Sequence, residues 1–129
     1  MGQPSPQLLR HLKALSYAYA LSVSNDYRHL KVHRVKLPPG FNASHVDVLI
    51  DIPADYPMSP PGVGNSRIYL PCGLRFRGKP LEHLYEGSSN GRKEWAWFCY
   101  RGIRWNPCQD DLIRLMELNR VYLTNPLTK

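Results

Sequence analysis

Residues 45–61, HVDVLIDIPADYPMSPP, carry the strongest structural signal in the chain. In the first half, Val46, Val48, Ile50 and Ile52 recur at every second position. This period of two is typical of a strand that buries one face. The second half is rich in proline, which cannot donate to a strand ladder and therefore ends the strand. We expect a regular strand followed by a stiff turn.

Two more strands are predicted before this one. Residues 17–24 alternate in the same way, and Asn25-Asp26 supplies a turn. Residues 30–36 read less regularly, with Leu30 and Val32 facing one way and Arg34 as a candidate third residue of that face, and they end at the LPPG sequence of residues 37–40. Three sequential strands with short turns predict an antiparallel meander whose apolar face needs a cover.

Two amphipathic helices can provide that cover. Leucines at helical spacing follow Pro4-Ser5-Pro6 and predict a helix near residues 5–16. After Trp105, Asn106 can cap a second helix with Pro107 at its first position, ending near Thr124. Its predicted inward stripe is Leu112, Leu115, Met116, Tyr122 and Leu123. The expected fold class is α+β, with an N-terminal helix, a meander sheet, a long loop and a C-terminal helix packed on the sheet.

Length and composition predict one domain over residues 1–129, because 129 residues with 43% hydrophobic content suit a single core. Residues 55–105 are richer in proline, glycine and polar side chains, so we expect a long irregular region that carries function. The apolar runs are too short for a signal peptide or a membrane span. Three cysteines without C-x-x-C spacing favour reduced thiols. The expected location is the cytoplasm.

Charge and metal-ligand spacing narrow the possible partners. Seventeen Lys and Arg against ten Asp and Glu give a net charge of +7, which favours acidic partners. No recognition helix or aromatic strand motif accompanies this charge, so a nucleic-acid partner is disfavoured. The three cysteines and His83 lack the paired spacing of structural zinc sites, and we expect neither metal nor cofactor.

Three landmarks occur in a characteristic order. They are Tyr56-Pro57 followed by Pro60-Pro61, the segment RIYLPC at 67–72, and Trp105-Asn106-Pro107. In this order they resemble the ubiquitin-conjugating enzyme family. The sequence LPPGF at 37–41, a tryptophan-rich stretch and the W-x-P-x-x-D-D-L pattern at 105–112 are similar to the bacterial branch of that family, found beside genes for ubiquitin-like proteins and activating enzymes.

The chain departs from the standard enzymes at one important triplet. Leu70 and Cys72 stand where the standard enzymes carry the His and the Asn of a His-Pro-Asn sequence. In the family, that Asn stabilises the oxyanion during transfer to an amine. The usual oxyanion donor is therefore missing.

Carriers of this family need a cysteine nucleophile, and the resemblance implies Cys99. It lies six residues before Trp105, close to the family's interval, and Arg101 and Arg104 follow it. Positive charge beside a thiol favours the reactive thiolate. The plainer interpretation of Cys99 is a small buried residue in an aromatic cluster.

Two other cysteines remain open as nucleophiles. Cys72 is the runner-up, because it falls in the loop that approaches the family's cleft and Gly73 gives its backbone freedom. Cys108 would lie in the first turn of the last helix, where the helix dipole favours a thiolate.

Supporting and scaffolding roles complete the predicted site. Asn90, Tyr100 or a backbone N–H near Cys99 could replace the missing oxyanion donor, and the sequence does not select among them. The predicted scaffold of the cleft is Tyr56, Pro57, Pro60, Pro61, Trp105 and Pro107.

The resemblance implies a conjugating enzyme that accepts a ubiquitin-like protein from an activating enzyme as a cysteine thioester and passes it to an acceptor protein. The alternative is a catalytically inactive variant of the same fold that binds a ubiquitin-like protein or scaffolds a partner enzyme. Loss of the triplet's His and Asn motivates this second hypothesis. No membrane partner is expected.

Overall fold

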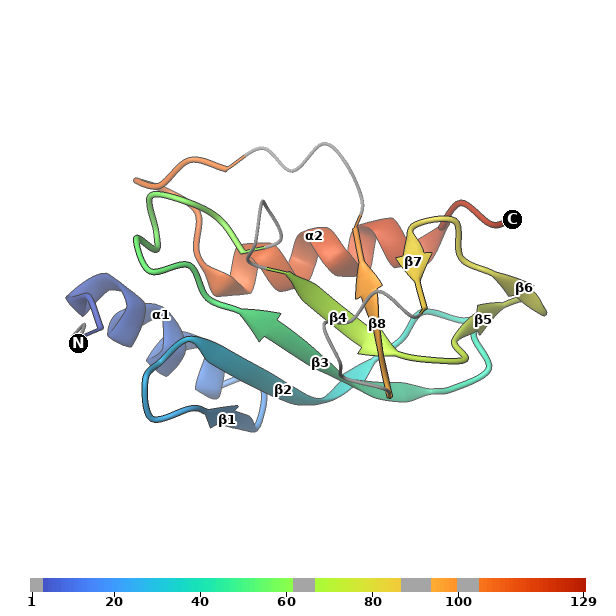
Figure 1. The fold of residues 1–129 in the computed structure, drawn as a ribbon, viewed down its shortest axis with the longest axis horizontal. Coiled ribbons are helices and arrows are strands. Elements are labelled where there is room, and N and C mark those ends of the chain that lie inside the picture. The colour runs from blue at the N-terminus through green and yellow to red at the C-terminus, as the bar shows by residue number, and fades with distance from the viewer. Residues whose placement is uncertain (1–3, 62–66, 87–93, 100–104) are drawn as a thin grey trace.

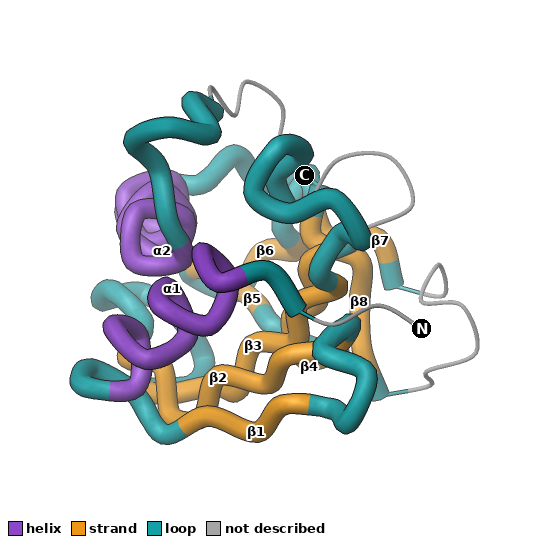
Figure 2. Tube along the Cα trace, turned by 90° about the vertical axis from the view of Figure 1, so that its left-hand side faces the viewer, coloured by secondary structure: helices purple, strands orange, loops and turns teal. Residues whose placement is uncertain are grey.

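The computed structural model describes residues 4–61, 67–86, 94–99 and 105–129. Both helices lie on one side of the main sheet, and α2 runs along it (Figures 1 and 2). In chain order the elements are α1 Pro6–Ser16, β1 Leu21–Val23, β2 His29–Lys36, β3 His45–Asp51, β4 Ile68–Pro71, β5 Arg75–Phe76, β6 Lys79–Pro80, β7 Leu84–Tyr85, β8 Trp95–Phe98 and α2 Leu112–Thr124.

The main sheet has six strands in the order β1-β2-β3-β4-β8-β7, and every neighbouring pair is antiparallel. Strands β5 and β6 form a separate hairpin. The predicted meander corresponds to β1, β2 and β3. Neither helix of the described residues has the length and apolar run that a membrane crossing requires.

Strand β3 confirms the strict alternation of its sequence. Val46, Val48, Ile50 and Ile52 are all buried, because alternate side chains of a strand face the same side and here that side meets the helices. The first helix is confirmed as well. Ser5 caps it by accepting a hydrogen bond of 3.0 Å from the Leu8 N–H.

The first strand is shorter than predicted. Only residues 21–23 pair with β2, and the Tyr17 side chain is 81% exposed. The N–H groups of Tyr17, Ala18 and Tyr19 instead donate to carbonyls at the end of α1. The closing turn of the helix thus takes residues that the alternation had assigned to a strand.

The irregularity of β2 has a physical cause. Its register with β3 shifts between Val32 and Val35, and Arg34 within the shift is exposed with φ of 54°. The Arg34 N–H donates to Asp47 Oδ1 at 3.0 Å. Arg34 therefore does not face inward with Leu30, and that part of the prediction was wrong.

Residues 55–105 are more regular than their composition predicted. Two four-residue runs, Ile68–Pro71 and Trp95–Phe98, pair with each other and form two inner strands of the main sheet. Apolar runs this short cannot be assigned from period alone. These two runs are strands because they pair with each other, although more than twenty residues separate them in the sequence.

The last helix begins later than predicted. Its cap is Asp111, whose side chain accepts from the Arg114 N–H at 2.8 Å. Asn106 instead starts a separate turn, in which its Oδ1 accepts from the Cys108 N–H at 2.9 Å. Asn106 and Pro107 therefore do not start the helix.

The predicted end at Thr124 is confirmed. Leu112, Leu115, Met116 and Leu123 are buried as expected, whereas Tyr122 is only partly buried and packs on Phe98 with ring centroids 5.4 Å apart.

Candidate functional site

The Tyr-Pro turn and the Trp-x-Pro segment meet in space. The Trp105 indole Nε1 donates to the Pro57 carbonyl at 2.6 Å, and the rings of Tyr56 and Trp105 lie 5.9 Å apart. The Tyr56 hydroxyl is 2.7 Å from His11 Nδ1 on α1. Two of the sequence landmarks are thus joined to each other and to the first helix. Of the remaining predicted scaffold residues, Pro61 is buried while Pro60 and Pro107 are half-buried.

Burial controls the protonation of the two side chains in this contact, Tyr56 and His11. It raises the pKa of Tyr56, and the Asp111 carboxylate raises it further. Burial lowers the pKa of His11; Asp111 acts in the opposite direction and Arg10 adds to the lowering. Both groups are therefore held in their neutral forms, which suits a hydrogen bond between packed elements.

Cys99 directly follows β8, at the end of the sheet toward which that strand points. Ala96 and Phe98 of β8 are buried against the helices, while Trp95 and Trp97 alternate with them and face the other side. The Cys99 N–H donates to the His83 carbonyl at 2.9 Å, so the ladder with the β7 side continues to this residue. By the same alternation the Cys99 side chain falls on the outer face of the sheet, away from both helices.

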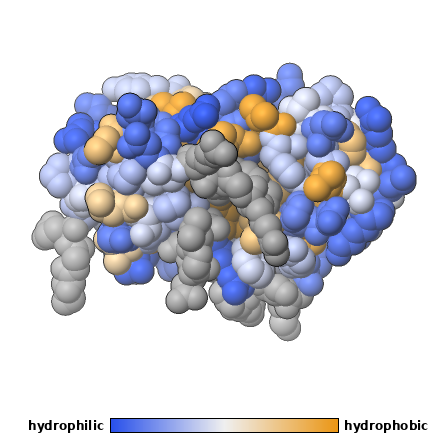
Figure 3. All heavy atoms as spheres, turned by 90° about the horizontal axis from the view of Figure 1, so that it is seen from above, coloured by the Kyte–Doolittle hydropathy of each residue, from blue (hydrophilic) through white to orange (hydrophobic). Residues whose placement is uncertain are grey.

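The Cys99 side chain is partly exposed and forms no disulfide. Seen from the side toward which β8 points, the described atoms are mainly hydrophilic, with hydrophobic atoms in small separate patches (Figure 3).

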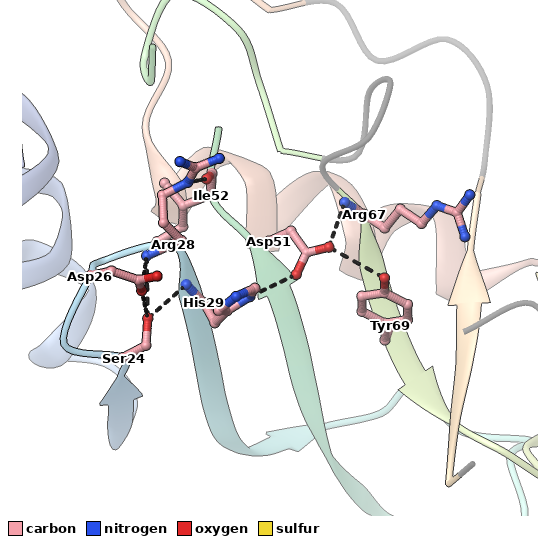
Figure 4. A network of polar contacts seen from close by, with 8 residues as sticks. All are labelled: Ser24, Asp26, Arg28, His29, Asp51, Ile52, Arg67 and Tyr69. Atoms are coloured by element: carbon pink, nitrogen blue, oxygen red, sulfur yellow. Dashed lines mark hydrogen bonds and ion pairs between the residues drawn. The ribbon is translucent and has the colours of Figure 1, made fainter. Parts of the chain in front are cut away.

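A polar network borders this end of the sheet, and sequence reasoning gave it no role. Asp51 is its centre: Oδ1 lies 3.1 Å from His29 Nδ1, and Oδ2 accepts from the Arg67 N–H and the Tyr69 hydroxyl, each at 3.3 Å. The Arg67 guanidinium lies 4.1 Å from the centroid of the Trp97 ring. Figure 4 shows its side chain extending from the start of β4 to the end of β8.

Cys72, the alternative nucleophile, lies at the opposite end of the same strand pair. Pro71 pairs with Trp95, the first residue of β8, and the Cys72 N–H donates to the Glu94 carbonyl at 3.0 Å. The Cys72 side chain packs against the core. Burial raises the pKa of its thiol, and the Glu86 carboxylate raises it further. Both effects disfavour the thiolate at this position.

Cys108 is exposed, but it lies in the turn before α2. Because α2 begins at Leu112, the expectation that Cys108 sits in the first helical turn was wrong. Four predicted supporting residues, Asn90, Tyr100, Arg101 and Arg104, lie outside the described residues. Among the residues that are described, no three His, Cys, Asp or Glu side chains gather closely enough to hold a metal ion.

This architecture is consistent with the E2-like class of conjugation proteins. It consists of an N-terminal helix, an antiparallel sheet and a C-terminal helix, and its Tyr-Pro turn is hydrogen-bonded to the Trp-x-Pro segment. The model of prokaryotic E2 family E matches residues 6–125, and the chain belongs to this family. Membership assigns the chain, at a coarse level, to the carriers of ubiquitin-like conjugation. Neither the curated proteins nor the solved structures gave a match.

Proposed function

We propose that this protein is a conjugating enzyme that carries a ubiquitin-like protein on Cys99. In this function an activating enzyme delivers the ubiquitin-like protein, and an acceptor protein receives it. The observation that carries the proposal is the position of Cys99, partly exposed at the end of β8 in a chain of an E2 family. A carrier sulfur must be reachable by the extended C-terminal tail of its cargo, and the Cys99 side chain is partly exposed.

The chemistry consists of two acyl transfers. In the first, the Cys99 thiolate attacks the thioester carbonyl on the activating enzyme, a new C–S bond forms, and the activating enzyme's thiolate leaves. In the second, an amine of the acceptor attacks the new thioester, a C–N bond forms, the Cys99 thiolate leaves, and the amine loses a proton to a base. Both steps pass through a tetrahedral oxyanion that needs a positively charged or N–H partner.

Packing and charge favour Cys99 over Cys72 as the carrier, although both side chains are partly exposed. Cys72 is packed against the core beside Glu86, which repels both a thiolate and a carboxylate tail. Cys99 instead lies at the strand end that Arg67 borders. A positive neighbour favours the oxyanion of the transfer.

A second function, a non-catalytic binding module of the same fold, is favoured by one observation. Leu70, at the position of the family's triplet His, is 2% exposed and pairs with the buried Ala96. The triplet position thus serves the core in this chain. A module that only binds a ubiquitin-like protein would need no polar catalytic side chain at that position.

Acylation by a synthetic thioester separates the two functions without an identified partner. The purified chain is incubated with a short glycyl-peptide thioester of 2-mercaptoethanesulfonate, and the adduct is located by peptide mass mapping. We expect a thiol-sensitive adduct on Cys99 that is absent in Cys99→Ala and unchanged in the matched control Cys108→Ala, which removes an exposed thiol. An adduct that persists in Cys99→Ala would move the nucleophile elsewhere, and no adduct on any cysteine would favour the binding module.

A further inference from the structure

We propose that Arg67 is a catalytic residue that stabilises the oxyanion formed at Cys99, in place of the Asn missing from the family's triplet. This inference rests on the proposed function, since it concerns the same acyl transfer. It assigns a role to a residue that lies 32 positions before the cysteine (99 − 67) and outside the segment around it.

Continued by one residue past its last pair, the β4–β8 register sets Arg67 opposite Cys99. Ile68 pairs with Phe98 and Tyr69 with Trp97 in the antiparallel β4–β8 pair, so the next positions opposite each other are Arg67 and Cys99. Residues directly opposite in such a pair have Cβ atoms about 4.5–5.5 Å apart and side chains on the same face. The face is the outer one, because Ile68 and Phe98 of the preceding pair are buried on the inner side.

The contacts of Arg67 agree with that placement. Its guanidinium stacks on Trp97, the outward residue of β8 two positions before Cys99. The side chain therefore reaches across to β8 and ends near the strand terminus, as Figure 4 shows. A guanidinium presents five N–H donors and a permanent charge, which fits an oxyanion better than the neutral amide it would replace.

The position of Arg67 is held by its neighbours. The Asp51 N–H donates to the Arg67 carbonyl at 2.7 Å, and the Arg67 backbone N–H donates to Asp51 Oδ2 at 3.3 Å. Trp97 supports the plane of the guanidinium from one side. Such preorganisation is what makes a donor effective at the moment when charge develops.

The cysteine's other cross-strand neighbour is oriented differently. His83 lies one position past the Leu84–Phe98 pair of the β7–β8 ladder and does not follow the alternation of that ladder, because its ring contacts Tyr122 of α2 with centroids 6.0 Å apart. That contact turns the His83 ring toward the helices. Of the two cross-strand neighbours of Cys99 in the described part of the chain, Arg67 is therefore the one whose cationic side chain we assign to the outer face.

Two reactions of the same thiol test this role. Acylation of Cys99 by the glycyl-peptide thioester passes through an oxyanion, whereas alkylation by iodoacetamide is a direct displacement that forms none. Arg67→Met keeps the aliphatic stem on Trp97 and removes charge and donors, and Arg67→Lys keeps the charge. Arg114→Ala, at an exposed arginine of α2, is the matched control.

We expect Arg67→Met to slow acylation by at least tenfold, toward the ~10²–10³-fold loss typical of a removed oxyanion donor. Its alkylation rate should stay within about twofold of the wild type, Arg67→Lys should fall between, and Arg114→Ala should match the wild type in both reactions. Circular dichroism confirms that each variant is folded, and Arg67→Lys keeps the test decisive if Arg67→Met does not fold.

Three outcomes overturn the assignment or the function beneath it. Unchanged acylation in Arg67→Met would refute the catalytic role of Arg67 alone. Equal slowing of acylation and alkylation would show that Arg67 only shapes access to the thiol. Absence of acylation in the wild type would instead refute the proposed function.

Discussion

Among the glycines that the structure describes, Gly40 in the LPPGF turn is where an added methyl group should cost most. Its φ is +107°, a backbone conformation that residues with a Cβ rarely adopt, and forcing one there costs about 1–3 kcal/mol. A Cβ built on Gly40 would lie 2.6 Å from Phe76 Cε1, inside van der Waals contact. Overpacking of this kind adds about 1–3 kcal/mol.

The Phe76 ring has little room to retreat. Phe76 is 7% exposed and meets Phe41 edge-on, with ring centroids 5.0 Å apart. The Arg77 N–H also donates to the Gly40 carbonyl at 2.7 Å, so the turn cannot move away without breaking that bond. We therefore expect Gly40→Ala to lower the free energy of unfolding by about 2–6 kcal/mol, a large share of the ~5–15 kcal/mol of a whole domain.

Urea denaturation followed by circular dichroism measures this loss, and Gly73→Ala is the matched control. Gly73 also has positive φ, +83°, but a Cβ there would meet nothing within 4 Å, so only the backbone cost of about 1–3 kcal/mol applies. Adding Phe76→Leu to Gly40→Ala should recover part of the loss, because the smaller side chain removes the overlap. A loss in Gly40→Ala no greater than in Gly73→Ala would refute the steric reasoning.

Two further changes test one partly buried and one buried polar side chain. Burial holds the pKa of His11 in the folded chain below its ordinary 6.5. As the pH falls, His11 of the unfolded chain is therefore protonated before His11 of the folded chain. The free energy of unfolding should consequently fall as the pH drops below about 6.5. His11→Gln should flatten this part of the profile in urea titrations between about pH 8 and pH 5, and an equally steep profile would contradict the assignment. Asn119 is 6% exposed, and neither atom of its amide has a hydrogen-bond partner among the described residues. Asn119→Leu should therefore raise the free energy of unfolding by about 1–2 kcal/mol in the same assay, whereas a loss would show that the amide is satisfied.

Elements whose signal is contained in neighbouring residues could be predicted from the sequence. The alternation from Val46 to Ile52 specifies β3 because every second side chain is apolar, and in a strand every second side chain faces the same side of the sheet. Ser5 specifies the start of α1 because its side chain caps an N–H only three residues away. These interactions need no information from the rest of the chain.

The start of α2 could not be predicted in this way, because the sequence offers two suitable caps. Asn106 and Asp111 can each accept from an N–H in the following turn, and both do so in the structure. A tertiary contact accompanies the choice: the Trp105 indole is bonded to the Pro57 carbonyl, which ties this segment to the Tyr-Pro turn. The helix then begins at the second cap, where Leu112 reaches the core.

The candidate site depends even more on tertiary pairing. Leu70, at the position of the family's triplet His, is held in the core by its pairing with Ala96, so that position cannot supply a polar group to the reacting carbonyl. The same register that buries Leu70 sets Arg67 opposite Cys99 on the other face, because side chains alternate along β4. Burial of the triplet position and the setting of Arg67 opposite Cys99 thus follow from one strand pairing. A shift of that pairing by one residue would reverse both, since every side chain of β4 would change face.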